Sequence, residues 1–154
     1  MRRVIDTLNE MSFNLPEGWH LTKDRYNIMN GQGFINKENY LSDDGRVISL
    51  FEVHRDPDEF FAGYQNLIKK YNTLTDKFQY QDQFVIKLNG FNFPMYVIKG
   101  FSEKVIYNIQ VFVNCGDCLA CFMITLNKFD EDLKKLSEES TLFNDLIEIL
   151  RTVE

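Results

Sequence analysis

The sequence has few of the residues that interrupt or replace an ordinary folded core. Only three Pro and eight Gly occur among 154 residues, which excludes collagen-like repeats and argues against a disordered chain. No apolar run approaches the length of a bilayer span, and Asp6 and Glu10 interrupt any signal-peptide core near the start. We therefore expect one soluble, cytoplasmic domain over residues 1–154, with no insertion into a membrane.

Positive charge is also scarce. Seventeen Lys and Arg face twenty-three Asp and Glu, for a net charge of −6. Proteins that bind nucleic acid or anionic membranes concentrate positive charge, and the only basic clusters here are pairs of neighbouring residues. We therefore expect no nucleic-acid partner.

Motifs that carry catalysis are missing. The sequence has no phosphate-binding loop, no nucleophile elbow and no H-E-x-x-H helix. His20 and His54 are the only histidines, and His54 lies just before a predicted helix N-terminus, where it has no evident nucleophile or second base. We predict a protein that is not an enzyme, has no catalytic residues and carries no cofactor.

The clearest predicted element is a helix from Pro57 to Leu74. Asp56 is a favourable N-cap and Pro57 suits the first helical position. Apolar and aromatic residues recur every three or four positions from Phe60 to Leu74, which indicates a helix with one face in the core.

Two hairpins follow, and their turns and patterns agree. A two-residue turn at Asn89-Gly90 pairs Leu88 with Phe91, Ile86 with Phe93 and Phe84 with Met95, so that all six lie on one face. A turn at Gly116-Asp117 likewise pairs apolar residues from Val113–Ala120 to Tyr107–Leu126. Joined through residues 100–104, the hairpins predict a four-stranded antiparallel meander.

Further elements complete the predicted α+β fold. Phe34 to Leu41 and Arg46 to His54 are expected to form strands around a turn, after an earlier strand that ends near Ile28. Residues 130–150 predict one closing helix or two short ones, with Asp130 as the first cap and Ser140 as the second. The fold class is therefore an antiparallel sheet, built from the meander and the N-terminal hairpin strands, flanked by two main helices.

The three cysteines form the string Cys115-x-x-Cys118-x-x-Cys121, which invites a metal-site hypothesis. The predicted register opposes this hypothesis, because Cys115 and Cys118 face each other beside the turn whereas Cys121 points to the other face. We therefore predict no metal, and two thiols in a reducing cytosol, although a Cys115–Cys118 disulfide is sterically conceivable.

The second face of the meander is mixed in character. It alternates amides with aromatic and aliphatic residues, and on the first strand it includes Gln79, Gln81 and Gln83. Either the N-terminal strands or the last helix cover this face, or it is a surface that binds a partner. The candidate partner-binding residues are Tyr96, Ile98, Ile106, Asn108, Gln110, Phe112, Leu119, Cys121 and Met123.

The order of elements resembles a known family. The opening Phe13-x-Leu15-Pro16-x-Gly18-Trp19, the hairpin, the helix, the meander and Thr125-Leu126-x-x-Phe129-Asp130 before the closing helix are similar to the PsbP-like superfamily, and within it to the bacterial DcrB-like proteins. The resemblance implies an antiparallel sheet with flanking helices and members that mostly bind macromolecules. One branch comprises homodimeric chaperones that hold the hydrophobic N-terminal helices of type VI secretion effectors.

Three functions follow as hypotheses. The first is a non-enzymatic, cytoplasmic protein-binding module that acts as a chaperone or adaptor for a secreted effector. Its ligand would be a hydrophobic helix of that effector. A homodimer is among the oligomeric states expected for it. The second is an immunity protein whose acidic surface blocks a toxin domain. The third is an enzyme that uses the His54 region, and a further alternative is a protein of unknown function with a small-molecule ligand.

Overall fold

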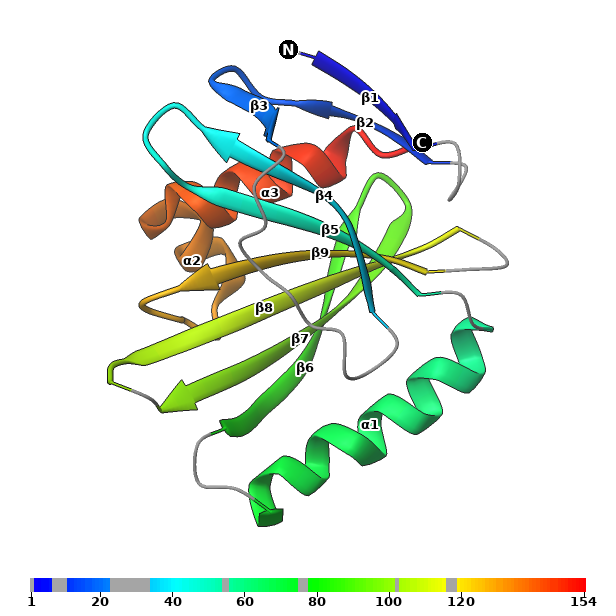
Figure 1. Ribbon diagram of the computed structural model, residues 1–154, viewed down its shortest axis with the longest axis vertical. Coiled ribbons are helices and arrows are strands. Elements are labelled where there is room, and N and C mark those ends of the chain that lie inside the picture. Colours follow the sequence, from blue (N-terminus) through cyan, green and yellow to red (C-terminus); the bar gives the residue numbers. More distant parts are fainter. Residues whose placement is uncertain are drawn as a thin grey trace.

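The chain folds into two antiparallel sheets and three helices in the computed structural model, which describes residues 2–6, 11–22, 34–53, 56–74, 78–101, 103–115 and 119–154 (Figure 1). A two-stranded sheet pairs β1 with β2, and a seven-stranded sheet has the order β3-β4-β5-β9-β8-β7-β6. The strands are β1 (Arg2–Asp6), β2 (Met11–Leu15), β3 (Trp19–Thr22), β4 (Ile35–Ser42), β5 (Val47–Val53), β6 (Phe78–Leu88), β7 (Phe91–Phe101), β8 (Val105–Asn114) and β9 (Leu119–Leu126). The helices are α1 (Pro57–Leu74), α2 (Leu133–Glu139) and α3 (Thr141–Arg151).

The predicted α+β class, meander and register are confirmed. Strands β6 to β9 pair in sequence order, with Ile86 opposite Phe93 and Val111 opposite Phe122. Asn89 and Gly90 have φ angles of 50° and 82°, the two positive values that a type I′ turn requires. The turn predicted at 116–117, the strand ending near Ile28 and the environment of His54 lie outside the described residues.

The register departs from strict alternation at one place in β6. Tyr80 pairs with Ile98 and Asp82 with Val97, so Gln81 is the extra residue of a β-bulge. Gln79 pairs with Lys99 and Gln83 with Tyr96, so the strict alternation predicted from Gln79 to Gln83 is interrupted by the bulge. Strands β7 and β8 also continue closer to their connection than predicted, because Phe101 pairs with Val105.

Helix α1 begins and ends as predicted, and Asp56 accepts a hydrogen bond from the backbone N–H of Glu59 at 3.1 Å. The closing region forms two helices, and Ser140 caps the second by accepting from Phe143 N–H at 3.1 Å. The first cap is Asp132 rather than Asp130, because Asp130 instead accepts from the backbone N–H of Asp132. The predicted two main helices are therefore α1 and the α2–α3 pair.

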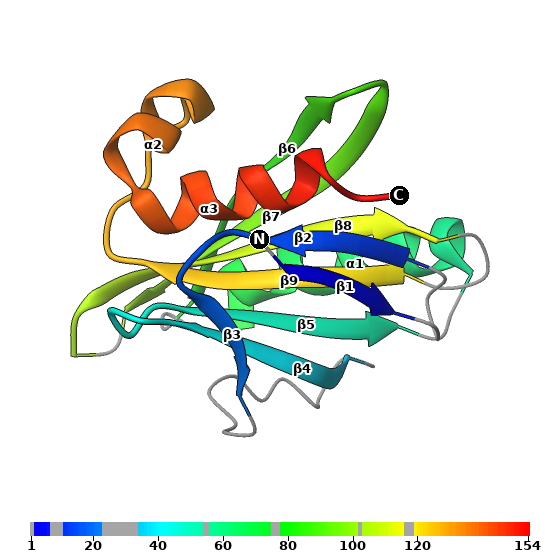
Figure 2. The same cartoon turned by 90° about the horizontal axis from the view of Figure 1, so that it is seen from above.

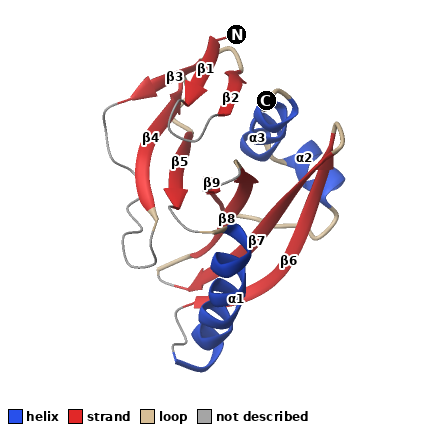
Figure 3. Cartoon of the chain, turned by 90° about the vertical axis from the view of Figure 1, so that its right-hand side faces the viewer, coloured by secondary structure: helices blue, strands red, loops and turns tan. Residues whose placement is uncertain are grey.

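Both faces of the seven-stranded sheet are covered, by different layers (Figures 2 and 3). On one, which we call the α3 face, α2, α3 and β2 enclose the larger apolar cluster, in which Phe13 packs edge-on against Phe122. On the other, which we call the α1 face, α1 encloses a second cluster rich in aromatic rings. None of the described helices is long and apolar enough to span a membrane.

The C-terminal end of the chain lies beside β2 on the α3 face. Ser12 of β2 and Glu154 exchange backbone hydrogen bonds of 3.2 and 2.9 Å, and Asn14 N–H donates to Thr152 Oγ1 at 2.8 Å. The tip of the β6–β7 hairpin bends toward the same region, where Asn89 Nδ2 donates to the carbonyl of Arg151 at 3.0 Å (Figure 1). These contacts hold α3 against the sheet from both sides.

We predict opposite effects for two Gly-to-Ala substitutions. Gly90→Ala forces an L side chain to adopt a φ of 82°, which costs about 1–2 kcal/mol of unfolding free energy. Gly63→Ala lies in α1, where nothing approaches the added Cβ within 4 Å, and stabilises the fold by about 0.5–1 kcal/mol. Urea unfolding measures both, and destabilisation by Gly63→Ala would contradict the helical assignment.

Candidate functional site

The predicted partner-binding residues lie on the α1 face, beneath α1. Tyr96, Ile98, Gln110, Phe112, Leu119, Cys121 and Met123 are buried, and Ile106 and Asn108 are half-buried. The structure brings most of them together, but as a core rather than as an open surface. The cover is α1, which corrects the expectation that the N-terminal strands or the last helix cover this face.

Aromatic rings from α1 explain this burial. Phe60 and Phe61 pack on Phe112 with ring centroids 5.6 and 5.2 Å apart, and Phe61 also stacks on Tyr96 at 6.1 Å. Tyr64 packs edge-on against Tyr96 at 5.4 Å. These rings fill the space between the helix and the sheet.

The polar residues that gave this face its mixed character are hydrogen-bonded inside it. The Tyr64 hydroxyl donates to Gln110 Oε1, and Gln110 Nε2 donates to Asn108 Oδ1 at 2.8 Å. Gln65 Nε2 donates to the Tyr96 hydroxyl at 3.4 Å, and burial raises the pKa of that hydroxyl although the hydrogen bond opposes the shift. Amides at these positions therefore join α1 to the sheet, and a partner reaches them only if α1 leaves.

The described cysteines have different environments. Cys121 is fully buried in the α1-face cluster, and desolvation raises the pKa of its thiol well above the ordinary value. Cys115 is half-buried against the other cluster, and Cys118 lies outside the described residues. Within the part of the chain that the structure describes, no three His, Cys, Asp or Glu residues are grouped to hold a metal ion.

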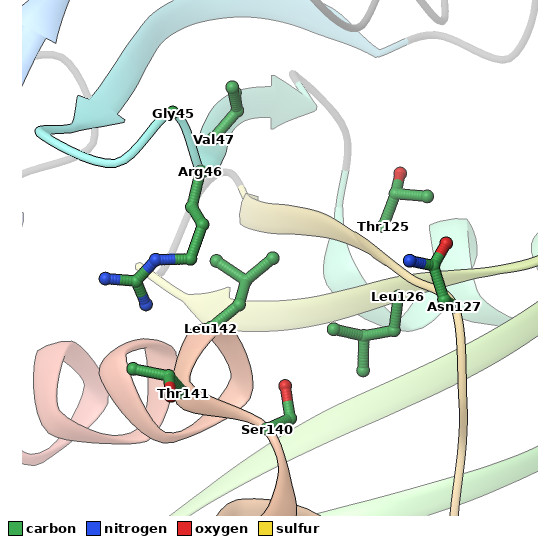
Figure 4. Close-up of a pocket in the computed structure, with 9 residues that line it drawn as sticks. All are labelled: Gly45, Arg46, Val47, Thr125, Leu126, Asn127, Ser140, Thr141 and Leu142. Atoms are coloured by element: carbon green, nitrogen blue, oxygen red, sulfur yellow. The ribbon is translucent and has the colours of Figure 1, made fainter.

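An open groove lies elsewhere, on the α3 face where β9 leaves the sheet and α2 turns into α3. It consists of two hollows that share Asn127 and Ser140 in their walls. The first hollow has a volume of 590 Å³ (Figure 4) and the second 530 Å³. The first is lined by Gly45, Arg46, Val47, Thr125, Leu126, Asn127, Ser140, Thr141 and Leu142.

A hydrogen-bonded cluster holds one wall of the first hollow in place. Arg46 donates to Asp44 from Nε and to Asp145 from Nη1, both at 2.9 Å, while Trp19 Nε1 donates to the same Asp145 oxygen at 2.9 Å. Burial opposes the charge of Arg46, but these hydrogen bonds outweigh it and raise its pKa. The pKa of Asp44 is lowered by hydrogen bonds from Ser42 and Arg46. The cluster joins the β4–β5 turn to α3.

The second hollow has an aromatic floor. Phe129 packs against the α3-face cluster, with its ring 5.8 Å from that of Tyr107 and 5.6 Å from that of Phe84. Both Phe129 and Tyr107 are half-buried, and both line the hollow. The residues that line it are Lys99, Val105, Tyr107, Asn127, Lys128, Phe129, Asp130, Leu136, Glu139 and Ser140.

Apolar surface continues from the second hollow along the β7–β8 hairpin. The end of this hairpin extends beyond α2 (Figures 1 and 2). Phe101 and Val105, which pair across its tip, are 38% and 41% exposed, and the next pair on the same face is Lys99 and Tyr107. We call Phe101, Val105, Tyr107 and the aliphatic part of Lys99 the apolar strip.

This arrangement suits the binding of a chain segment. It has an apolar floor and strip, a rim of hydroxyl and amide groups, and a size in the range of small binding sites. Sequence reasoning missed the groove because it assigned Tyr107 and Leu126 to the covered face of the sheet. The signal available was the length of the strands, which run past the end of the short helix α2.

We predict that Tyr96→Asp combined with Phe112→Asp unfolds the protein. Both side chains are 0% exposed, and truncating a buried Phe alone costs about 3–5 kcal/mol, before the added cost of burying carboxylates. Circular dichroism and thermal melting measure the loss of structure. Val85→Asp with Lys87→Asp is the matched control, because both residues are exposed. A folded Tyr96/Phe112 variant that fails to bind its partner would instead make the α1 face the binding surface.

Comparisons with known proteins identify the fold. No family model and no curated protein sequence matches this chain. Among solved structures, cyanobacterial PsbP (CyanoP) from Synechocystis sp. PCC 6803 is similar with a TM-score of 0.57 and 13% identity, over 99% of this chain and 91% of that one. The Ran-binding protein Mog1p of Saccharomyces cerevisiae is similar with a TM-score of 0.51 and 12% identity, over 99% and 94%.

A third similar structure is LpqN of Mycobacterium tuberculosis, which is involved in cell envelope biogenesis. Its TM-score is 0.51 and its identity 13%, over 93% of this chain and 81% of that one. Structural similarity at sequence identities this low establishes the fold and leaves the function open. The protein therefore has the PsbP-like α+β fold, in agreement with the resemblance seen in the sequence.

Proposed function

We propose that this chain is a non-enzymatic protein-binding module whose groove receives a segment of another protein. The observation that carries the proposal is the apolar strip, which leaves two large apolar side chains exposed at the entrance to an aromatic-floored hollow. Exposed apolar surface that runs into a concave, polar-rimmed site is typical of interaction sites.

The fold comparison supports a protein as the ligand class. Mog1p, which has a similar fold, is described as a Ran-binding protein. Most of the nine residues predicted to bind a partner belong to the core beneath α1, so this proposal places the contact surface on the opposite face of the sheet.

In its finer form the proposal is a cytoplasmic chaperone or adaptor for a secreted effector, on the DcrB-like branch of the superfamily. A chaperone of this kind covers an apolar helix that would otherwise aggregate, so it needs exposed apolar surface with a polar rim. The strip and the two hollows supply these features. A homodimer fits the same proposal if the groove faces away from the dimer contact.

We predict that Phe101→Glu combined with Val105→Glu lowers partner recovery at least tenfold. Both residues are exposed and the substitutions place charge on the strip, and thermal melting measures the stability lost to repulsion between the paired Glu side chains. The measurement is affinity purification of the tagged chain from its native host, with quantitative mass spectrometry of what accompanies it.

The matched control is Ile35→Glu with Phe91→Glu. Ile35 and Phe91 are 52% and 53% exposed. Each lies at the end of its strand that is farther from the groove. We expect the control to retain the partner. Loss of the partner in both variants, or retention in both, would contradict the groove as the binding site, and purification of the wild-type chain alone would count against the module itself.

The net charge of −6 favours a second candidate, an immunity protein that blocks a basic toxin domain. Salt concentration separates the two functions, because it screens interactions between exposed charges beyond about 10 Å at 0.1 M ionic strength. We predict that the dissociation constant of the captured partner rises less than fivefold between 50 and 500 mM NaCl. A rise of thirtyfold or more, measured by calorimetry, would favour the immunity protein.

A further inference from the structure

Two lysines in the groove, Lys99 and Lys128, form no ion pair with a carboxylate in the part of the chain that the structure describes. The Lys99 ammonium lies 5.0 Å from the centre of the Phe101 ring and 5.7 Å from that of Tyr107, so it sits over the apolar strip. Lys128 lines the same hollow and is exposed. Among the residues that the structure describes, neither amine forms an ion pair with a carboxylate.

The hollow is also lined by two acidic residues, Asp130 and Glu139. Asp130 forms an ion pair with Lys135 at 3.4 Å and also accepts a backbone hydrogen bond from Asp132. The pKa of Lys135 is raised mainly by its hydrogen bond to Asp130 and, to a smaller extent, by the charge of Glu139. Lys135 therefore offsets part of the acidic charge of this wall, and neither Lys99 nor Lys128 forms an ion pair with Asp130 or Glu139.

This charge pattern restricts what can cover the strip. A partner segment packed on Phe101, Val105 and Tyr107 also removes water from the Lys99 ammonium, which lies over the same rings. Burying an unpaired ammonium costs several kcal/mol, more than the cation–π contacts return at about 0.5–1 kcal/mol each. A segment that is apolar throughout therefore binds poorly here, whereas a carboxylate placed over Lys99 removes the penalty.

We infer that the groove selects a protein segment in which an Asp or Glu lies among apolar side chains. The apolar side chains cover Phe101, Val105 and the Tyr107–Phe129 floor, and the carboxylate pairs with Lys99 within reach of Lys128. This inference rests on the proposed function, and it adds the chemistry of the partner. The chain's own net charge of −6 repels strongly acidic proteins, so the acid is a local feature of a partner that is not acidic as a whole.

The test uses a displayed library of random 16-residue peptides, panned on the immobilised full chain. Peptides that bind the wild type but not the Phe101→Glu/Val105→Glu variant are groove ligands. We expect an Asp or Glu flanked by apolar residues in most of them. We expect Lys99→Met to raise their dissociation constant at least tenfold, because it keeps an apolar side chain but removes the charge. Lys87→Met, at an exposed lysine near the opposite end of the sheet, is the control and should change binding less than twofold.

A double-mutant cycle completes the test. Replacing the peptide's acid by its amide should weaken binding to the wild type at least tenfold, and binding to Lys99→Met less than threefold. Groove ligands without an acid, or with binding unchanged by Lys99→Met, overturn this inference and leave the proposed function in place. A library that yields no peptide dependent on Phe101 and Val105 overturns the proposed site itself.

Discussion

Both faces of the seven-stranded sheet carry apolar side chains, and each face needs its own cover. Tight pairing of β6 to β9 sends alternate residues to opposite faces, so Phe122 and Phe112 belong to different cores. One core is closed by α3 and β2, and the other by α1. The positions of the helices and of the open groove follow from this requirement.

The two covers differ in how much sheet they hide. Helix α1 has 18 residues and packs its aromatic rings along the sheet, with Tyr64 and Gln110 joined inside the interface. Helix α2 has only seven residues, and the β7–β8 hairpin extends past it. The groove is the consequence, because strands that outrun their cover leave apolar side chains at the boundary. A binding surface arises here from a mismatch in length rather than from a special motif.

Local sequence signals predicted much of this structure. Asn89-Gly90 fixed the register of one hairpin, Asp56-Pro57 marked the start of α1, and Ser140 marked the division between α2 and α3. The predictions that failed concern positions at which two nearby residues or two paired strands allow alternative arrangements. Asp130 and Asp132 are both cap-forming residues, and in the structure Asp132 accepts from the first N–H groups of α2 whereas Asp130 accepts from the N–H of Asp132. The bulge at Gln81 likewise depends on the pairing between two strands.

Apart from the bulge at Gln81, the sequence by itself determined which residues of the meander share a face of the sheet, because side-chain alternation and turn geometry act over a few residues. It did not determine which layer covers each face, since amides such as Gln110 are equally compatible with water and with hydrogen bonds to a helix. Only the tertiary structure decided that α1 buries the mixed face and that the groove opens on the other one. Burial depends on segments that are distant in the sequence. The role that we infer for Lys99 likewise depends on the folded structure, which places its ammonium over the rings of Phe101 and Tyr107.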